Sequence, residues 1–485
     1  MIGAYEAVIG IECHVELTTA TKMFCGCPNS FGGEPNTNVC PVCLGMPGAL
    51  PVPNARALEA IVTTGLALGA EIPSFSKFDR KNYFYPDMPK DYQISQYDAP
   101  LTQGGSVPYR LEDGTRKACR LTRIHLEEDT GKSSHAGSGD GRIAGSSYTL
   151  LDFNRAGVPL MECVSEPDIR SAAEAVAFLE SLRRTLLALG VSDVKMEEGS
   201  LRCDANVSVR PAGTAELGTK TEIKNMNSFR SVERAIESEI ERQIQILTSG
   251  GRVVQETRGW DEVKGVTHSM RSKEQAHDYR YFPDPDLVPL TISREDVERL
   301  RAALPELPWQ RFERYTQTFG LGEMQAEQLL DNLPLASYYD RVVSIGGNPQ
   351  RASTFVLGDL SRLANERGVA VSDSKVAPEH VAELAALVEA KTINSKIAKE
   401  LLARMWDGGG SPKAMVESEG LAQTSDPSAV EHFVDEVLSG NENVVADYKA
   451  GKTNVLGFLV GQFMKASRGK ADPALVNELV KKKLS

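Results

Sequence analysis

The segment Val8–Leu17 constrains the fold of this chain more than any other, because its side chains alternate between polar and apolar. It reads V-I-G-I-E-C-H-V-E-L. Successive side chains of a strand point to opposite faces, so Glu12, His14 and Glu16 would share one face at a spacing of about 7 Å. Carboxylates held that close repel one another unless a cation or a basic group lies between them. The pattern predicts a strand with one buried face, and it leaves open whether the polar face is a site or a solvated surface.

Three further segments repeat this design. The polar residues that would share a face are Arg123, His125, Glu127 and Asp129 in the first, Arg202, Asp204, Asn206, Ser208 and Arg210 in the second, and Lys220, Glu222 and Lys224 in the third. Carboxylate and amide oxygens hold hard divalent cations, while Arg and Lys bind phosphates. The repetition favours a sheet whose polar face is a functional site, with a large solvated sheet face as the alternative.

Four of the eight cysteines lie close together near the start of the chain. Cys25 and Cys27 form one pair, and Cys40 and Cys43 form a second pair after twelve intervening residues. Two such pairs can place four thiolates tetrahedrally around zinc, and a site with no open coordination position is structural rather than catalytic. In a chain without the features of a secreted protein, zinc binding is a better interpretation than disulfides.

The composition excludes several classes of protein. No apolar run approaches the ~20 residues that a membrane helix needs, and the N-terminus lacks signal-peptide features, so we expect a cytoplasmic protein with no membrane partner. The formal net charge is −12, yet residues 449–485 carry eight Lys or Arg against two Asp or Glu, which suits docking of a polyanion at that end. The sequence contains no P-loop motif and no nucleophile elbow, so a P-loop nucleotide site is excluded and hydrolytic nucleophile chemistry is unsupported.

The chain divides by pattern into three parts. Up to about Pro289, short alternating segments are interrupted by helical patterns at Asn54–Leu68, Ser171–Leu189 and Ser228–Leu247. Helical patterns then dominate, and a Gly-Gly-Gly-Ser-Pro run starting at Gly408 marks a flexible break. We expect an α+β protein with a large mixed or antiparallel sheet and a polar catalytic face in residues 1–292, an all-α domain in 293–407 and a small helical tail in 408–485.

Two loop regions combine aromatic with charged residues. They are 81–96, with K-N-Y-F-Y-P-D followed by K-D-Y-Q-I-S-Q, and 270–284, with M-R-S-K-E and H-D-Y-R-Y-F-P-D. Such segments suit stacking on a base or ribose together with charge contacts to phosphate. Loops that simply pack on the sheet are the alternative.

Seven ordered motifs resemble those of the B subunit of the tRNA-dependent aspartyl/glutamyl amidotransferase, the GatB family. They are I-G-I-E-C-H-V-E-L, C-P-V-C-L-G-M-P-G-A-L-P, R-K-N-Y-F-Y-P-D-M-P-K-D-Y-Q-I-S-Q, H-L-E-E-D-T-G-K, D-F-N-R-A-G-V-P-L-M-E, K-T-E-I-K-N-M-N-S-F-R and H-D-Y-R-Y-F-P-D-P-D. The resemblance covers essentially the whole chain. It implies a cradle domain that holds the activation site, then a helical domain and a tail that reaches tRNA.

The resemblance also implies a mechanism and partners. The chain would bind misacylated tRNA, Asp-tRNA(Asn) or Glu-tRNA(Gln), and would use Mg-ATP to phosphorylate the amino-acid carboxylate. An amidase, the A subunit of the complex, would release ammonia from glutamine. A small C subunit would complete a heterotrimer.

The same resemblance carries roles to individual residues. Glu12, His14, Glu127 and Glu162 would hold magnesium, and Lys81 would lie at the mouth of the ammonia passage. In that mechanism Arg202, Arg271 or Lys273 would clamp phosphates, while Asp204 and Asn206 would hold a second cation or water. The family usually has Gln where this chain has Glu16.

Two other functions stay open at this point. A non-catalytic, zinc-stabilised tRNA-binding scaffold would explain the cysteines, the basic tail and the aromatic loops equally well. It would not explain the polar sheet face. A free-standing ATP-dependent ligase is disfavoured, because the sequence shows no ammonia-generating site.

Overall fold

The computed structural model describes residues 4–136, 146–272, 278–422, 434–449, 452, 456–466 and 473–484. The chain forms two compact units, Met1–Trp309 and Gln310–Ser485, each described by itself below. Helix α4 (Arg294–Ala302) packs against α1 (Ala55–Ala67) and so belongs with the first unit. The division into 1–292, 293–407 and 408–485 stays a prediction.

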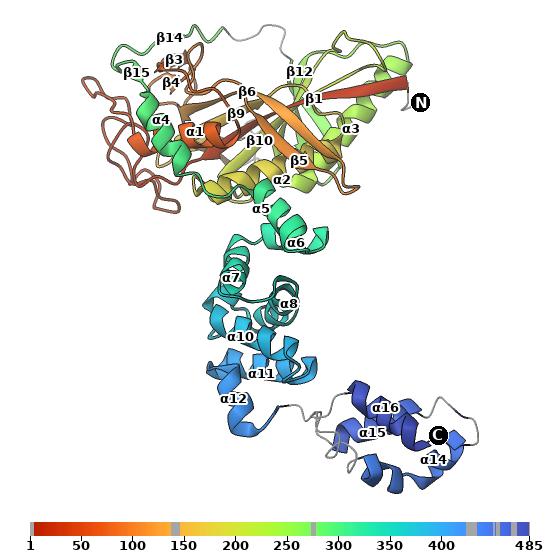
Figure 1. Ribbon diagram of the computed structural model, residues 1–485. Helices are drawn as coiled ribbons and strands as arrows, with labels where there is room; N and C mark the ends of the chain where they lie inside the picture. The colour runs from red at the N-terminus through yellow and green to blue at the C-terminus, as the bar shows by residue number, and fades with distance from the viewer. Residues whose placement is uncertain are drawn as a thin grey trace. The chain divides into compact units, whose positions relative to one another are not determined.

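The first unit is built on one mixed sheet of eight strands, in the order β13-β12-β11-β10-β1-β9-β6-β5 (Figure 1). Neighbouring strands run antiparallel, except β11 and β12, which are parallel. The bounds are β13 (Val266–Ser272), β12 (Glu256–Asp261), β11 (Thr221–Met226), β10 (Leu201–Pro211), β1 (Tyr5–Glu16), β9 (Pro159–Ser165), β6 (Arg116–Glu128) and β5 (Ser106–Arg110). The α+β class and the mixed sheet predicted from the sequence are confirmed.

Strand β1 has the two faces that its alternation predicts. Ile9, Ile11, Cys13 and Val15 are at most 1% exposed, whereas the polar residues between them are half-buried. The apolar face packs on α2 (Ala172–Leu189) and α3 (Phe229–Thr248), whose own apolar residues complete one core. Figure 1 shows these two helices on the same side of the sheet.

The helices of this unit begin at polar residues that cap them. Asn54, Ser171, Ser228 and Ser293 each accept backbone N–H groups of the first turn of α1, α2, α3 and α4. Such caps satisfy donors that have no partner within the helix. The helix starts predicted from the sequence are therefore confirmed at the level of single side chains.

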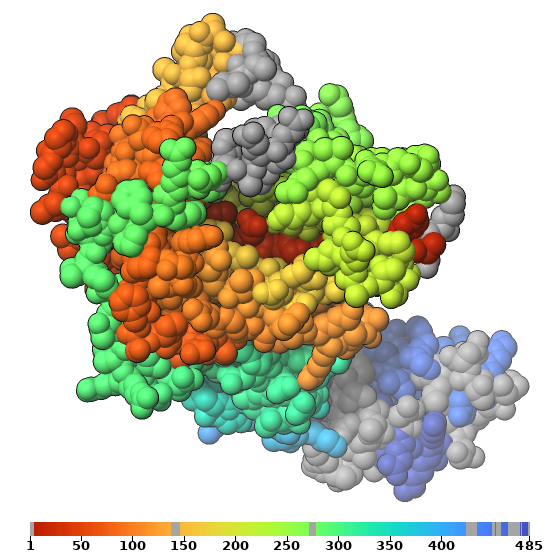
Figure 2. Space-filling model, turned by 90° about the horizontal axis from the view of Figure 1, so that it is seen from above, coloured from red at the N-terminus to blue at the C-terminus, as the bar shows by residue number. Residues whose placement is uncertain are grey.

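No helix of the part of the unit that the structure describes covers the opposite, polar face of the sheet. Figure 2 shows part of β1, in dark red, at the floor of a hollow between orange segments on one side and yellow-green segments on the other. Small sheets line this region: β14 (Phe282–Pro283) with β3 (Asp79–Asn82) and β4 (Tyr92–Ser95), β15 (Leu290–Thr291) with β2 (Phe75–Ser76), and β7 (Lys132–Ala136) with β8 (Tyr148–Asp152).

The described part of the second unit is helical. Its elements are α5 (Pro308–Glu313, starting at the end of the first unit), η2 (Arg314–Thr318), α6 (Glu323–Leu330), α7 (Leu333–Ser344), α8 (Pro349–Ser353), η3 (Thr354–Leu360), α9 (Ser361–Arg367), η4 (Val371–Asp373), α10 (Pro378–Glu389), α11 (Ser395–Gly408), α12 (Pro412–Glu419), α14 (Glu442–Lys449), α15 (Leu456–Ala466) and α16 (Pro473–Leu484). One core contains Tyr315 and Tyr339, and a smaller one contains Leu459 and Phe463. Among the described residues, no helix is both long and apolar enough to cross a lipid bilayer.

Candidate functional site

Three neighbouring strands bring imidazoles and carboxylates together on the polar face. In the sheet register His14 of β1 lies opposite Glu162 of β9, and Glu162 lies opposite His125 of β6. Glu127 is two residues further along β6, on the same side. The site is therefore a consequence of strand order, since these residues are far apart in the sequence.

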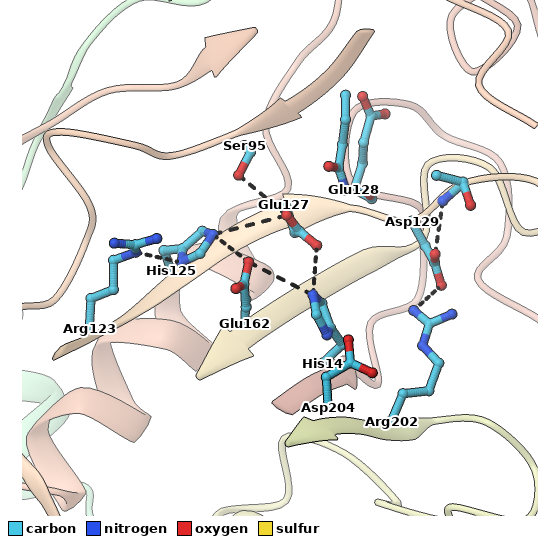
Figure 3. A network of polar contacts seen from close by, with 12 residues as sticks. His14, Ser95, Arg123, His125, Glu127, Glu128, Asp129, Glu162, Arg202 and Asp204 are labelled. Carbon is cyan, nitrogen blue, oxygen red and sulfur yellow. Dashed lines mark hydrogen bonds and ion pairs between the residues drawn. The ribbon is translucent and has the colours of Figure 1, made fainter. Parts of the chain in front are cut away.

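The side chains of this cluster are in contact (Figure 3). His14 Nε2 lies 3.6 Å from Glu127 Oε1 and 3.8 Å from Glu162 Oε2. His125 Nε2 lies 3.0 Å from the same oxygen of Glu162. The hydroxyl of Ser95 donates a hydrogen bond of 3.3 Å to Glu127 Oε2. Glu127 and His125 are each 2% exposed, so this is a buried polar network rather than a solvated strand face.

Basic groups compensate the charge of the two carboxylates. Burial alone would raise the pKa of Glu162, but His125, His14 and Lys81 outweigh it and hold this pKa well below its usual range. Burial alone would lower the pKa of Lys81, but Glu127, with help from Glu162, keeps that pKa above its usual range. Lys81 is thus a half-buried ammonium whose charge interacts with Glu127 and Glu162, and its place at an ammonia passage stays a prediction.

Tyrosines from the predicted aromatic loops lie next to Lys81. The Lys81 ammonium is 5.0 Å from the centroid of the Tyr279 ring. Tyr281 stacks on Tyr97, with ring centroids 4.3 Å apart and planes 10° from parallel. Burial raises the pKa of Tyr281 to about 12, so its hydroxyl stays protonated. Tyr279 therefore places an aromatic ring near the Lys81 ammonium, and this contact favours the charged form of the lysine.

The donor atoms of His14, Glu127 and Glu162 are arranged to hold a metal ion. They lie within 4.8 Å of one another. Two carboxylates suit magnesium, and an imidazole also suits transition metals, so the donor set fits a divalent cation. Glu12 is not part of this group of described residues. Its Oε1 instead accepts a hydrogen bond of 2.8 Å from Asn206 Nδ2.

Glu12 belongs to a second acidic group beside the first. It lies opposite Asp204 in the register of β1 and β10. Burial, followed by the charges of Glu162, Asp204 and Glu222, raises the pKa of Glu12. The ammonium of Lys224 forms ion pairs with Asp204 and, at 3.2 Å, with Glu222. Lys224 thus neutralises part of the charge at Asp204, which was predicted, together with Asn206, to hold a second cation or water.

Arg202 is held by a buried carboxylate. Its Nη2 lies 2.7 Å from Asp129 Oδ2, and Arg155 Nε lies 3.5 Å from the same oxygen. Burial would raise the pKa of Asp129, but these two guanidinium groups keep it below its usual range. Burial and the charge of Asp129 raise the pKa of the adjacent Glu16 to about 7. Arg202 therefore has a structural partner in addition to the predicted phosphate contact.

Two predicted phosphate ligands have no described side chain. Arg271 lies in β13, where its backbone pairs with Thr257, and Lys273 lies outside the described residues. Their role stays a prediction.

The sequence pattern assigned no individual role to His125, Ser95, Asp129 or Lys22. The alternation R-I-H-L-E places His125 on the same face as Glu127. This pattern would have been sufficient to assign His125 to the site. The same alternation placed Asp129 on this face, but its pairing with Arg202 and the contact of Ser95 with Glu127 join separate elements, and no local pattern encodes them.

The four cysteines meet as their spacing predicts. One sulfur from each of Cys25, Cys27, Cys40 and Cys43 lies within 4.8 Å of the other three. The backbone N–H of Cys40 donates to Cys43 Sγ at 3.0 Å. Hydrogen bonding from Cys25 lowers the pKa of Cys43 to about 5, whereas burial raises the pKa of Cys27 to about 11. Among the described residues the group consists of these four sulfurs, a donor set that fits structural zinc.

Comparison with known proteins shows the family to which the chain belongs. The GatB/GatE catalytic domain matches residues 7–298, and the GatB domain matches residues 337–484. The aspartyl/glutamyl-tRNA(Asn/Gln) amidotransferase B subunit of Moorella thermoacetica is 55% identical over 99% of this chain and 100% of its own length. The proteins of that name from Carboxydothermus hydrogenoformans and Persephonella marina are each 51% identical over 99% of both chains. The chain belongs to the GatB family, as its motifs predicted.

Proposed function

We propose that this chain is the B subunit of an aspartyl-tRNA(Asn)/glutamyl-tRNA(Gln) amidotransferase, an ATP-dependent carbon–nitrogen ligase of protein biosynthesis. It binds misacylated tRNA and uses Mg-ATP to phosphorylate the side-chain carboxylate of the attached Asp or Glu. Ammonia from the amidase, the A subunit, then displaces phosphate to form Asn or Gln, and a small C subunit completes the heterotrimer. The observation that carries this proposal is the convergence of His14, Glu127, Glu162 and Lys81 in one hollow.

The chemistry needs activation because a carboxylate has no good leaving group. Attack of the carboxylate oxygen on the γ-phosphorus of ATP gives an acyl phosphate and releases ADP. Attack of ammonia on the acyl carbon then releases inorganic phosphate, and a proton leaves the nitrogen. His14, Glu127 and Glu162 would hold magnesium, which would supply positive charge to offset the charge that develops on the phosphate.

The residues of the hollow would divide the work. His14, Glu127 and Glu162 would hold magnesium, with His125 and Ser95 orienting the two carboxylates. Lys81 would face the incoming ammonia beside Glu127. Arg202, Arg271 or Lys273 would contact phosphates, and Glu12, Asp204 and Asn206 would hold a second cation or water.

A groove of about 330 Å³ next to Glu12 supports the placement of a nucleotide. Glu12 and Asn206 line it at one end, and Gly10, Ser208 and Lys220 line it further along. Gly10 faces Ser165 and Pro167, which also line the groove: a Cβ built on it would lie 3.9 Å from atoms of both residues. A ligand in this groove would have its polar end at the acidic residues of β1.

The test is ADP release by the assembled enzyme with glutamyl-tRNA present. We expect Glu12→Ala to abolish ADP release while glutaminase activity persists, because the amidase site lies on a different chain of the complex. Retention of ADP release by this variant would remove Glu12 from the metal assignment.

The alternative is a non-catalytic, zinc-stabilised tRNA-binding scaffold. Binding of ATP to the isolated chain, measured with and without Mg²⁺, separates the two. Magnesium-dependent binding that Glu127→Gln eliminates would support the catalytic role, and absence of binding would support the scaffold.

A further inference from the structure

Lys22 is one of the largest fully buried side chains of the protein, with 1% of its surface exposed. A buried ammonium is costly unless an anion and hydrogen-bond acceptors surround it. Among the residues that the structure describes, no carboxylate forms an ion pair with Lys22. Its counter-charge must come from another chemical group.

The contacts of the Lys22 ammonium identify that group. Nζ donates to the carbonyl oxygen of Asn38 at 2.8 Å and to that of Phe153 at 3.5 Å. The third donor is directed to Cys43 Sγ at 3.8 Å, a normal length for a hydrogen bond to sulfur. An ammonium has three protons, and these three acceptors use all of them. Of these three acceptors, only the cysteine sulfur can carry a full negative charge.

A carboxylate does lie in the same region, but it has another partner. Gly157 lies among these groups: a Cβ built on it would lie 3.6 Å from Cys43 Cβ, 3.8 Å from Lys22 Cδ and 4.0 Å from Glu128 Oε2. Oε1 of Glu128 forms an ion pair with Lys90 and accepts the backbone N–H of Ile94 at 2.9 Å. The Lys22 ammonium itself contacts Cys43 Sγ, so the sulfur cluster is the anionic group that it touches directly.

We propose that Lys22 is a positioning residue of the zinc site: it offsets the charge of the metal–thiolate cluster and slows zinc release. This inference rests on the proposed zinc site. Zinc with four thiolates carries a net charge of −2, which is unfavourable in a partly buried site. A fixed ammonium beside Cys43 compensates part of that charge and also ties the cysteine loops to Phe153. Loss of zinc would remove the four-thiolate cluster and leave the sulfur of Cys43 as the counter-charge of the ammonium.

The experiment compares the full-length chain with Lys22→Met and Lys22→Gln. Lys22→Gln keeps two N–H donors but loses the charge, so it separates hydrogen bonding from electrostatics. The control is Lys77→Met, which removes a half-buried ammonium that pairs with Asp79 and Asp98 instead. Zinc content is measured by mass spectrometry, and zinc release is followed with a colorimetric chelator. Partners of metal ligands typically change metal affinity by about 10- to 100-fold.

We expect Lys22→Met to release zinc about 10- to 100-fold faster than the unmodified chain, Lys22→Gln to be intermediate, and Lys77→Met to be unchanged. If both Lys22 variants release zinc at the original rate, the inference is wrong although the zinc site stands. If the unmodified chain contains no zinc, both the proposed zinc site and the inference about Lys22 are wrong. Neither readout depends on ADP release, so these outcomes are separate from the proposed ligase activity.

A measurement without substitution covers the case in which the variants do not fold. Acetylation of lysine amines, read out by peptide mass spectrometry, should leave Lys22 unmodified in the zinc-loaded protein. Chelation of zinc should make Lys22 reactive while Lys77 keeps its rate. Equal reactivity of Lys22 with and without zinc would overturn the inference.

Discussion

The cysteine cluster and the histidine–carboxylate cluster are both candidate metal sites, but they are assembled in different ways. The four cysteines lie within one short stretch of sequence, so their spacing alone predicts the site. His14, Glu127 and Glu162 come from three strands that are neighbours only in the folded sheet. The first cluster has only sulfur donors and fits a structural ion. The second mixes imidazole with carboxylates near a half-buried lysine, and this arrangement is suited to chemistry.

The largest expected effect is on the histidine–carboxylate cluster. Glu127→Gln keeps the shape of the side chain but removes the charge that would bind magnesium. We expect tRNA-dependent ADP formation to fall by at least about 10²-fold, measured in the assembled enzyme with a coupled ADP assay. The exposed Glu112→Gln serves as the matched control and should keep full activity. Near-normal ADP formation by Glu127→Gln would mean that this cluster is structural.

In the cysteine cluster, we expect a substitution to lower the stability of the protein rather than to act directly on ADP formation. We expect Cys40→Ser to lose its zinc and to lower the melting temperature by at least about 5 °C, because structural zinc contributes folding free energy. Elemental analysis and calorimetry measure the two effects. Cys119→Ala, a buried cysteine outside the cluster, should keep its zinc. The contrast between the two clusters fails if Cys40→Ser retains a full equivalent of zinc.

Arg202 tests whether a residue of the polar face has a structural role as well. Arg202→Met leaves Arg155 as the remaining cationic partner of the buried Asp129 among the described residues, so we expect the free energy of unfolding to fall by about 2 kcal/mol. Urea unfolding followed by circular dichroism measures it. Arg120→Met breaks an exposed pair with Asp168 and should change stability less. Equal effects of the two variants would argue that Arg202 is available to phosphates alone.

The smallest expected effect lies outside both clusters. Ser171→Ala removes the cap of α2, whose hydroxyl accepts the backbone N–H of Glu174 at 3.1 Å. A lost cap of this kind costs about 1 kcal/mol of stability. Zinc content and ADP binding should stay unchanged in the same preparation. A change in either would show that the two clusters depend on helix packing more than their local contacts indicate.

The local elements of the fold were predictable, whereas the contacts within the site were not. Alternation placed β1 and β10, the capping box that begins at Ser171 placed the start of α2, and helical spacing placed α3, because these signals act over a few residues. The α+β class followed from those elements. The family and the class of enzyme came from the motifs, which the comparisons confirm.

The sequence did not predict which side chains of different strands contact one another. Strand order decides that His14 faces Glu162, and a register set by long-range pairing decides that Arg202 reaches Asp129. Lys22 gave no signal at all, because a lysine next to Met23 and Phe24 has no periodic pattern that predicts burial. The assignment of individual ligands, including the place of Glu12 outside the contact group of His14, depends on such contacts.

The buried ammonium of Lys22 has a consequence for how this chain can evolve. A cation enclosed without a carboxylate is tolerated only while the thiolates supply negative charge. A descendant that loses the four cysteines must therefore replace Lys22 by an uncharged residue at nearly the same time. Lysine at this position and the cysteine quartet should accordingly be gained and lost together across lineages.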